Sequence, residues 1–458
     1  MKARICIVGK VPPLQGGVSR LTLETARRLG QRGYDVHLVT NAEETENFFK
    51  QQWAPSDAEY LEQLQSSGVF VHNLVPLDER THIPYSPCFE TRMCGRICHV
   101  VREFNCSIIV GWYLQPYGVA ASMAARFTNR PYMIMHAGSD LAYLTEHPDL
   151  AVVHRQVLKD AAVVIHSPKE QVTTRLRKLG VDQTQLRACS GIPDLDALAE
   201  GFIEDVALPD VELDSTEFYR QLEAEYPDIY RSTDASVSRK TTDGPRILCA
   251  GKIAYSKNYG ALFEALDQLA QDGVEFHLIQ TLIGRKSDLK EHLALLEKLP
   301  RLRMRLTMLP PLTPWKIRTL MKQIDIGIYL ESGFTMDFHT SGLPLEFLAA
   351  NVALLISREG VNQGLLREIL RDGLNAAIVE VPSNSGEIRE KLRGLLTNPG
   401  NLHEMKDLGL MTLKHLSGKV KKTRQSPLIY QIISEFAEST MTSNDPDAQL
   451  LGRTPPRA

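Results

Sequence analysis

Short apolar runs alternate with amphipathic segments along most of the chain. Residues 5–8 form an apolar, mostly β-branched run that ends at Gly9, which predicts a buried parallel strand. From Val18 to Leu29, apolar and small residues recur at helical spacing, and residues 35–40 form the next strand-like run. A strand, a glycine loop, a helix and a second strand make a βαβ unit, so the pattern predicts an α/β fold with a parallel sheet.

The same alternation continues along the chain with one interruption. Before it, the predicted strands are 107–111, 132–136 and 161–166, and the predicted helices are 117–127 and 168–179. Residues 194–243 are acidic and polar, and one helix around 217–226 is predicted there. After it, the predicted strands are 247–250, 274–282, 326–329 and 353–357, and the predicted helices are 259–271, 314–323, 344–350 and 364–370.

Two similar α/β blocks joined by an irregular segment predict two doubly wound, Rossmann-like domains that face a central cleft. The predicted divisions are 1–193 for the N-terminal domain, 194–243 for an acidic linker or insertion, 244–425 for the C-terminal domain, 426–442 for a helix packing back towards the N-terminal domain, and 443–458 for a disordered tail.

Composition narrows the class of protein. Of 458 residues, 43% are hydrophobic and 23% charged, which is ordinary for a globular protein. Lys and Arg number 52 against 55 Asp and Glu, so the basic excess typical of nucleic-acid binding is missing and we expect no nucleic-acid partner. The seven scattered cysteines, and the lack of an apolar stretch near the roughly 18 residues of a spanning helix, predict a reduced, cytoplasmic protein without a signal peptide.

Gly16 and Gly17 open the first helix directly after the first strand. Free backbone N–H groups and the positive end of the helix dipole therefore lie at the carboxyl edge of the sheet, where anionic groups bind in open α/β folds. The spacing matches neither GxGxxG nor GxxxxGK[ST], which argues against dinucleotide binding and ATP hydrolysis. A plain tight turn is the alternative interpretation.

Two further loops follow predicted strands of the second block. Lys252 and Lys257 follow strand 247–250, where two ammonium groups would neutralise a diphosphate; two solvated surface lysines are the alternative. The loop after strand 326–329 leads into a capped helix start with Pro344 in its first turn. Glu346 in that turn would accept hydrogen bonds from vicinal hydroxyls, or would simply complement the helix dipole.

Several motifs between residues 5 and 375 occur in the order typical of one enzyme family. They are Gly16-Gly17-Val18-Ser19, His136-Ala137-Gly138-Ser139-Asp140-Leu141, Ser190-Gly191-Ile192-Pro193-Asp194, Gly251-Lys252 with Lys257, and Glu368 to Asn375. Together they resemble the retaining GT-B glycosyltransferases of family 4 (glycosyl transferases group 1), which use nucleotide-diphosphate sugars.

The resemblance implies a GT-B fold, with the acceptor on the N-terminal domain and the nucleotide sugar on the C-terminal domain. It implies that His136 lies beside the donor sugar, that Lys252 and Lys257 hold the diphosphate, and that Glu346 binds the ribose. Asp140 is explained more simply as a helix N-cap than as a base. The residues expected in catalysis are His136, Lys252 and Lys257, and those expected to bind the donor are Gly16, Gly17, Lys252, Lys257, Gly342, Leu343 and Glu346.

One departure from the family concerns the sugar. The family has two glutamates separated by seven residues, but counting back from Glu346 gives Phe338, so the first glutamate is displaced or replaced. The residues that would contact the sugar instead are Glu331, Asp337, His339, Thr340 and Ser341. Related inverting mannosyltransferases also lack the first glutamate, so both retention and inversion remain open.

The resulting hypothesis is a hexosyltransferase, active in polysaccharide biosynthesis, that moves a sugar from a UDP- or GDP-linked donor to an acceptor hydroxyl of a glycan, a lipid-linked glycan or a small molecule. We expect no cofactor, no essential metal and retention of configuration. The alternatives are a GT-B sugar-nucleotide epimerase and a degenerate nucleotide-sugar-binding protein without turnover. A short basic run at 419–424 is compatible with peripheral contact at the inner face of a membrane.

Overall fold

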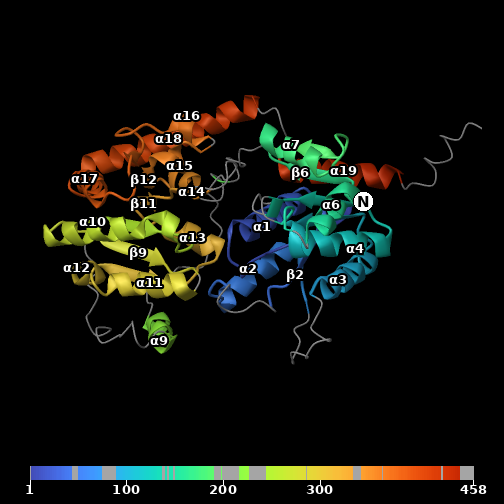
Figure 1. Ribbon diagram of the computed structural model, residues 1–458, viewed down its shortest axis with the longest axis horizontal. Helices are drawn as coiled ribbons and strands as arrows, with labels where there is room; N and C mark the ends of the chain where they lie inside the picture. Colours follow the sequence, from blue (N-terminus) through green and yellow to red (C-terminus); the bar gives the residue numbers. More distant parts are fainter. Residues whose placement is uncertain are drawn as a thin grey trace, which may run out of the picture. The chain divides into compact units, whose positions relative to one another are not determined.

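The computed structural model divides the chain into two units (Figure 1). The first unit comprises Met1–Gly191 and Arg424–Ala458, and the second comprises Ile192–Thr423. The structure describes residues 2–43, 50–74, 89–136, 140–141, 144–147, 150–189, 198, 216–225, 244–284, 286–333, 342–363, 365–423 and 427–443. Each unit is described below by itself.

The first unit contains a seven-stranded parallel sheet in the order β3-β2-β1-β4-β5-β6-β7. The strands are β1 (Arg4–Val8), β2 (Asp35–Thr40), β3 (Val69–Asn73), β4 (Ile108–Trp112), β5 (Tyr132–Met135), β6 (Val163–His166) and β7 (Leu186–Ala188). In the centre of the sheet, Ile5 pairs with Val36 on one side and with Ile108 on the other. All three side chains are fully buried, as expected for a sheet covered on both faces.

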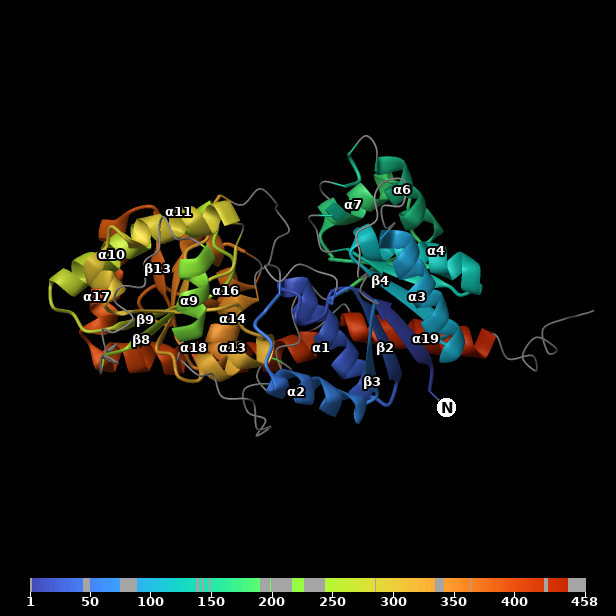
Figure 2. The ribbon, with the colours of Figure 1, turned by 90° about the horizontal axis from the view of Figure 1, so that it is seen from below.

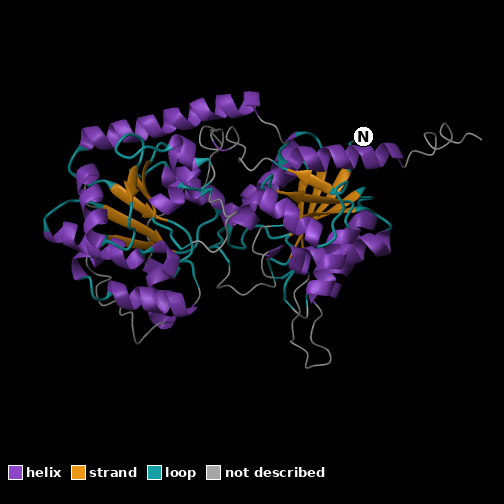
Figure 3. Cartoon of the chain, turned by 45° about the horizontal axis from the view of Figure 1, so that its top comes forward, coloured by secondary structure: helices purple, strands orange, loops and turns teal. Residues whose placement is uncertain are grey.

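Helices cover both faces of this sheet (Figure 3). They are α1 (Gly17–Gln31), α2 (Pro55–Gln65), α3 (Phe89–Glu103), α4 (Val119–Thr128), α6 (Ala151–Asp160), α7 (Glu170–Lys178) and α19 (Ile429–Ser443), with a π-helical turn at Leu114–Gly118. Helix α3 packs on α4, and the C-terminal helix α19 packs on α1 (Figure 2). The chain therefore returns to the first unit after completing the second.

The second unit repeats this architecture with a six-stranded parallel sheet in the order β10-β9-β8-β11-β12-β13. The strands are β8 (Arg246–Cys249), β9 (His277–Thr281), β10 (Leu306–Leu309), β11 (Ile326–Tyr329), β12 (Ala353–Ser357) and β13 (Ala377–Val379). The helices are α9 (Thr216–Glu225), α10 (Tyr259–Gln271), α11 (Lys286–Leu296), α12 (Pro300–Arg303), α13 (Pro314–Met321), α14 (Leu343–Ala349), α15 (Arg358–Val361), α16 (Leu366–Ile369), α17 (Ser385–Leu396) and α18 (Pro399–Thr423), with a 3₁₀ turn at Tyr255–Lys257. Helices α10 and α17 pack side by side.

The α/β class with two doubly wound parallel sheets is confirmed. Within the predicted linker 194–243, the described residues are Leu198 and helix α9, which agrees with the helix predicted around 217–226. Helix α9 is attached to the second unit, because the Met308 backbone N–H donates to the Tyr219 hydroxyl at 2.8 Å. The predicted tail 443–458 lies outside the described residues, apart from Ser443.

The helix predicted over 364–370 is wrong in length, since α16 is a single turn, Leu366–Ile369. The chain becomes extended at Leu370, and the Asn375 side chain holds the turn that follows. Its Oδ1 accepts from the Arg371 N–H at 2.8 Å, and its Nδ2 donates to the Ile369 carbonyl at 2.9 Å. Asn375 in the last quoted motif therefore shapes the backbone.

Gly30 in α1 permits a close approach between the helix and the chain that leads into β3. A Cβ at this position would lie 2.2 Å from the Ser67 carbonyl oxygen, which belongs to the backbone and has no rotamer to change. Gly95 in α3 is a matched contrast, because a Cβ there meets no described atom within 4 Å.

We expect Gly30→Ala to destabilise the protein by about 1–3 kcal/mol or more through overpacking. Gly95→Ala should instead stabilise it by about 0.5–1 kcal/mol, because alanine loses less backbone entropy in a helix. Thermal unfolding midpoints of both variants and the wild type measure the difference. Equal midpoints for the two variants would contradict the packing described here.

Two histidines meet across β2 and β3. His37 Nδ1 and His72 Nε2 lie 3.0 Å apart, and the His37 ring stacks on Phe104 with a centroid distance of 4.2 Å. Burial lowers the pKa of each histidine from 6.5 to about 4, and for His37 the nearby Asp35 opposes this shift. Both rings are therefore neutral in the folded protein at neutral pH.

Acid should weaken the first unit through this pair. In the unfolded chain both histidines bind protons below about pH 6.5, whereas in the folded chain they do so only near pH 4. The free energy of unfolding should therefore fall as the pH drops from 6.5 to 4. The double variant His37→Phe/His72→Phe keeps the aromatic stacking and should lose this part of the pH dependence in denaturant titrations. His403→Gln, at an exposed position of α18, is the control and should keep the wild-type dependence.

Candidate functional site

The carboxyl edge of the first unit carries the predicted glycine loop. Gly16 precedes α1 with φ at 112°, a conformation that favours glycine, and a Cβ at Gly16 or Gly17 would meet no described atom within 4 Å. The start of α1 is thus open to a ligand, and its first N–H groups carry the positive end of the helix dipole.

Buried polar atoms without hydrogen-bond partners gather around the strand ends at this edge. Among the described residues they include the hydroxyls of Ser19, Thr40 and Ser167 and both ring nitrogens of His136. These residues follow or end β1, β2, β6 and β5, whose carboxyl ends lie at one edge of the parallel sheet. They are spread along this edge from β2 to β6. Because an unsatisfied buried polar group costs about 1–3 kcal/mol, ligand groups or water are expected to complete the hydrogen bonds at these positions.

His136 lies directly after β5 and is only 6% exposed. Burial lowers its pKa, and the nearby Asp140 partly opposes this effect. The imidazole is therefore neutral at neutral pH, with one nitrogen able to donate and the other to accept a hydrogen bond. The predicted catalytic histidine is thus placed among the unsatisfied groups of this edge.

Asp140 fixes the local backbone. Its Oδ2 accepts from the Leu114 N–H and its Oδ1 from the Leu141 N–H, both at 2.9 Å. These bonds tie the turn after β4 to the segment after β5, so Asp140 fixes the backbone here. Neither bond is that of a helix N-cap, which accepts from the second or third helical N–H, so the capping role stays a prediction. His154 in α6 is also fully buried near Asp140, and its ring nitrogens have no hydrogen-bond partner among the described residues. No motif surrounds this histidine, so sequence reasoning does not identify it as a candidate site residue.

In the second unit, the loops after β8 and β11 meet at the carboxyl edge. Lys257 forms an ion pair with Glu331, and the two side chains are only 13% and 14% exposed. The Tyr329 hydroxyl donates to the other carboxylate oxygen of Glu331 at 2.9 Å. Both oxygens of Glu331 therefore have partners, and the Lys257 ammonium is held close to the sheet.

Asn258 fastens these two loops together. It adopts a left-handed conformation with φ at 54°, and its Nδ2 donates to the Leu330 carbonyl at 2.7 Å and to the Ser332 hydroxyl at 2.9 Å. The Ser332 N–H donates to the Ser256 carbonyl at 2.8 Å. The backbone around Lys257 is consequently fixed before any ligand binds.

Gly251 leaves room for the lysine. Its φ is 103°, and a Cβ there would lie 3.2 Å from the Lys257 Nζ. Lys252, the next residue, is exposed on the same loop. The two predicted diphosphate-binding lysines thus share one loop but differ in environment, since Lys257 is paired and largely buried.

The predicted ribose-binding segment begins α14. Gly342 is the residue before the helix, Leu343 is its first residue, and Glu346 lies in its first turn and is 7% exposed. The other proposed sugar contacts lie outside the described residues: Asp337, His339, Thr340 and Ser341. Glu331 is described, and it is placed against Lys257 and Tyr329.

No group of three or more His, Cys, Asp or Glu side chains is arranged to hold a metal ion in the part of the chain that the structure describes. None of the described helices is long and apolar enough to cross a membrane.

The Lys257–Glu331 pair should be strongly coupled. In a double-mutant cycle of Lys257→Met and Glu331→Gln, we expect a coupling energy of about 1–3 kcal/mol, because each single variant leaves a largely buried polar group without its partner. Arg358 and Glu380, whose side chains are 40% and 57% exposed, form the control cycle and should couple by about 1 kcal/mol or less. Denaturant unfolding of the wild type and the six variants measures both energies. Equal coupling in the two cycles would contradict the burial described here.

Comparison with known proteins gives a family match for part of the chain and similar solved structures for its fold. Residues 16–190 match a family model described as "Glycosyl transferase 4-like domain". No curated protein matches the chain.

Solved structures with similar folds have low sequence identity to this chain. A glycosyltransferase from Rickettsia africae ESF-5 has 15% identity and a TM-score of 0.54, covering 97% of this chain and 100% of its own. Anabaena Alr3699/HepE, in complex with UDP-glucose, has 13% identity and a TM-score of 0.56, with 96% and 100% covered. A putative UDP-N-acetylglucosamine 2-epimerase from Listeria monocytogenes has 13% identity and a TM-score of 0.50, with 94% and 100% covered.

These likenesses extend over nearly the whole chain and agree with two doubly wound parallel sheets in sequence. Because an epimerase shares the fold with glycosyltransferases, the fold alone does not select the reaction. The chain has the GT-B fold, and its residues 16–190 match the glycosyl transferase 4-like domain.

Proposed function

We propose that this protein is a glycosyltransferase that moves a sugar from a UDP- or GDP-linked donor to an acceptor hydroxyl. The observation that carries the proposal is the largely buried Lys257 ammonium, fixed at the carboxyl edge of β8 and β11 by Glu331 and Asn258. A cation held in this way suits a diphosphate leaving group. The domain match over residues 16–190 and the fold shared with a UDP-glucose complex support the same assignment.

In the proposed reaction, the bond between the anomeric carbon and the β-phosphate oxygen breaks, and the acceptor oxygen forms the new bond to that carbon. Negative charge grows on the departing diphosphate, where Lys257 and Lys252 stabilise it. The acceptor hydroxyl proton passes to the departing phosphate when configuration is retained. Because the lysines supply the positive charge, we propose that the reaction needs no metal ion.

His136 is proposed to orient the donor sugar. Its neutral ring offers one donor and one acceptor to sugar hydroxyls, and its two nitrogens have no described partner that would compete. Gly16 and Gly17 would contribute backbone N–H groups, and Glu346 in the first turn of α14 would accept from the ribose.

Glu331 is proposed to take over the function of the displaced family glutamate. It lies beside Lys257, so a diphosphate oxygen that binds the ammonium replaces one of its partners. The carboxylate is then available to the hydroxyls of the donor sugar. The acceptor is proposed to be a glycan or a lipid-linked glycan, and the cell compartment the cytoplasm, with contact to the inner face of the membrane.

The second candidate is a sugar-nucleotide epimerase, favoured by the fold shared with the Listeria protein. An epimerase would exchange the C2 proton of the nucleotide sugar with solvent deuterium without an acceptor, whereas a transferase would leave that proton in place. A binding protein without turnover would do neither but would still bind nucleotide.

We expect UDP or GDP to raise the thermal unfolding midpoint, and the better nucleotide identifies the donor. Slow hydrolysis of the matching nucleotide sugar should fall by about 10²–10³ in Lys257→Ala, by analogy with other leaving-group and oxyanion contacts. Glu346→Ala should weaken nucleotide binding. The measurements are differential scanning fluorimetry and release of free sugar.

Lys406→Ala is the matched control. Lys406 also forms a partly buried ion pair, with Asp325 at 2.9 Å, at the opposite end of β11. This variant should hydrolyse the donor at the wild-type rate. No stabilisation by any of UDP, GDP, ADP or dTDP would overturn the proposal, and equal hydrolysis by wild type, Lys257→Ala and Glu346→Ala would show that the site is wrongly placed.

A further inference from the structure

Two histidines lie next to each other at the carboxyl edge of the first unit's sheet. In the register of β5 and β6, Met135 pairs with Ile165, so the next residues along the two parallel strands are His136 and His166. Neighbouring strands are about 4.8 Å apart, and residues at paired positions present their side chains on the same face of a sheet. His166 also contributes to the low pKa of His136, although burial is the main cause. The two imidazoles therefore share one part of the edge.

The tautomer of His166 follows from its hydrogen bond. Its Nδ1 lies 2.7 Å from the Ser167 carbonyl oxygen, which can only accept, so Nδ1 carries the proton. In the neutral ring, Nε2 then has an available lone pair, and this nitrogen makes no hydrogen bond to a described residue. The side chain is 4% exposed. His166 thus presents an acceptor in a fixed orientation, whereas no hydrogen bond among the described residues selects the tautomer of His136.

The groups around His166 keep its ring neutral. Burial lowers its pKa and Arg177 of α7 adds to that effect, while the hydrogen bond to the Ser167 carbonyl opposes it. On the other side, the Cys189 N–H donates to the His166 carbonyl at 2.8 Å, and burial raises the pKa of the Cys189 thiol to about 11, so the thiol is uncharged. None of the described groups that shift the pKa of His166 is a carboxylate. The lone pair on Nε2 is therefore present at neutral pH.

The polar atoms beside Nε2 suit hydroxyl groups. They are the two ring nitrogens of His136 and the buried Ser167 hydroxyl oxygen, which all lack hydrogen-bond partners among the described residues. Each of these groups is neutral, and each is able to bind a hydroxyl or a water molecule. This part of the edge therefore fits the hydroxyls of a sugar or of an attacking acceptor.

We propose that His166 is the base that takes the proton of the attacking hydroxyl. The inference rests on the proposed transfer reaction, in which His136 orients the donor sugar, and it concerns a step that Lys252 and Lys257 do not perform. As the acceptor oxygen bonds to the anomeric carbon, the bond from that carbon to the β-phosphate oxygen breaks, and its electron pair leaves with the diphosphate. The hydroxyl proton moves to Nε2 of His166.

The product of this step is an imidazolium that keeps its Nδ1–H bond to the Ser167 carbonyl and afterwards releases the proton to solvent. In this route the departing phosphate does not take the proton, which fits inversion of configuration. The fixed tautomer is what assigns the step to His166, because a base must present an unprotonated nitrogen to the hydroxyl.

His166→Asn in the full-length protein tests the proposal. The asparagine amide is able to keep the hydrogen bond to the Ser167 carbonyl but lacks Nε2, so a purely structural role survives while the base is lost. The probe is hydrolysis of UDP-glucose or GDP-mannose, with water as the acceptor. We expect the rate to fall about 10²-fold or more, with the rise of the unfolding midpoint caused by UDP or GDP unchanged.

His277→Gln is the matched control. His277 is also a buried strand histidine, 7% exposed, whose Nε2 lies 2.8 Å from the Thr307 hydroxyl oxygen, but it begins β9 and so lies at an amino edge. Glutamine is able to keep that hydrogen bond. This variant should hydrolyse the donor at the wild-type rate.

The pH dependence separates a base from a residue that only positions the acceptor. Protonation of Nε2 removes the base, so the wild-type rate should fall about tenfold per pH unit below the pKa of His166, which lies under its ordinary value of 6.5. The side-chain oxygen of His166→Gln accepts a hydrogen bond but takes up no proton in this range. This variant should therefore be slow at neutral pH and should lack the acidic decline.

A wild-type rate in His166→Asn would overturn the proposal. An acidic decline that persists in His166→Gln would assign it to another group, such as His136, and would overturn the proposal as well. Hydrolysis that depends on Lys257 but not on His166 would overturn this inference alone. No stabilisation by nucleotides together with no hydrolysis by the wild type would overturn the glycosyltransferase assignment too, so the two failures are distinguishable.

Discussion

Parallel strand pairing is the constraint on which both units depend. Every strand of the seven-stranded and six-stranded sheets pairs in parallel with its neighbours in the described chain. Each connection must therefore cross a face of the sheet, and the crossing helices bury both faces. Fully buried residues such as Ile7, Val110 and Leu248 occupy those faces, and the polar side chains of the candidate site lie at the strand ends.

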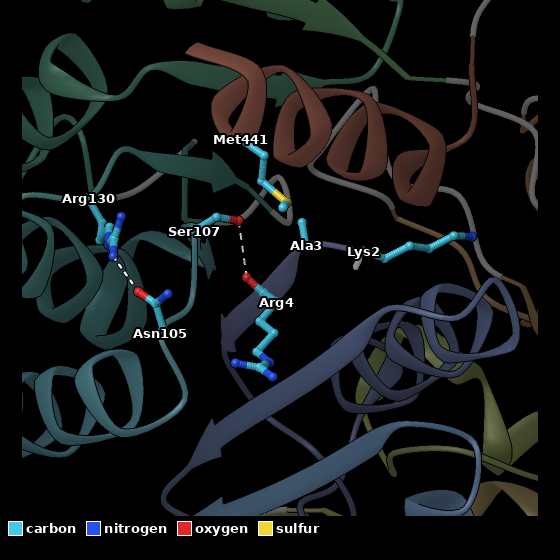
Figure 4. Close-up of a pocket in the computed structure, with 7 residues that line it drawn as sticks. All are labelled: Lys2, Ala3, Arg4, Asn105, Ser107, Arg130 and Met441. Atoms are coloured by element: carbon cyan, nitrogen blue, oxygen red, sulfur yellow. Dashed lines mark hydrogen bonds between the residues drawn. The ribbon is translucent and has the colours of Figure 1, made fainter. Parts of the chain in front are cut away.

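One edge of a parallel sheet carries the carboxyl ends of the strands and the other carries the amino ends. Different polar groups lie at these two edges. At the carboxyl edges, strands lead into helix starts. There lie neutral His136, whose ring nitrogens have no hydrogen-bond partner among the described residues, and Lys257, which is paired with Glu331. At the amino edge of the first unit's sheet, Arg4 and Arg130 line a cavity of about 230 Å³ (Figure 4). The net charge of -3 therefore conceals cations that are placed singly at strand ends.

The sequence predicts the central strands because they are continuous apolar runs, as in β1, β8 and β11. The sequence does not reveal β3 (Val69–Asn73), because this strand lies at an edge of the sheet. Beyond Val69 its residues are only partly buried, so their hydrophobic pattern has no clear period. The residues of the candidate site are recognisable from their place after strands. Their partners are not, because contacts such as His37–His72 and Lys257–Glu331 span 35 and 74 residues and depend on sheet order.

Under the proposed function, the Lys257–Glu331 pair gives a physical interpretation of the glutamate that is displaced relative to the resembled family. In the proposed reaction, a diphosphate would take the place of Glu331 on Lys257. The carboxylate, 14% exposed, would then keep the Tyr329 hydroxyl as its described partner. Leaving a largely buried charge half-satisfied is costly, so binding is favoured when the same ligand brings new donors. The hydroxyls of a hexose attached to the diphosphate would be such donors. The proposed site would therefore prefer an intact nucleotide sugar over a bare diphosphate.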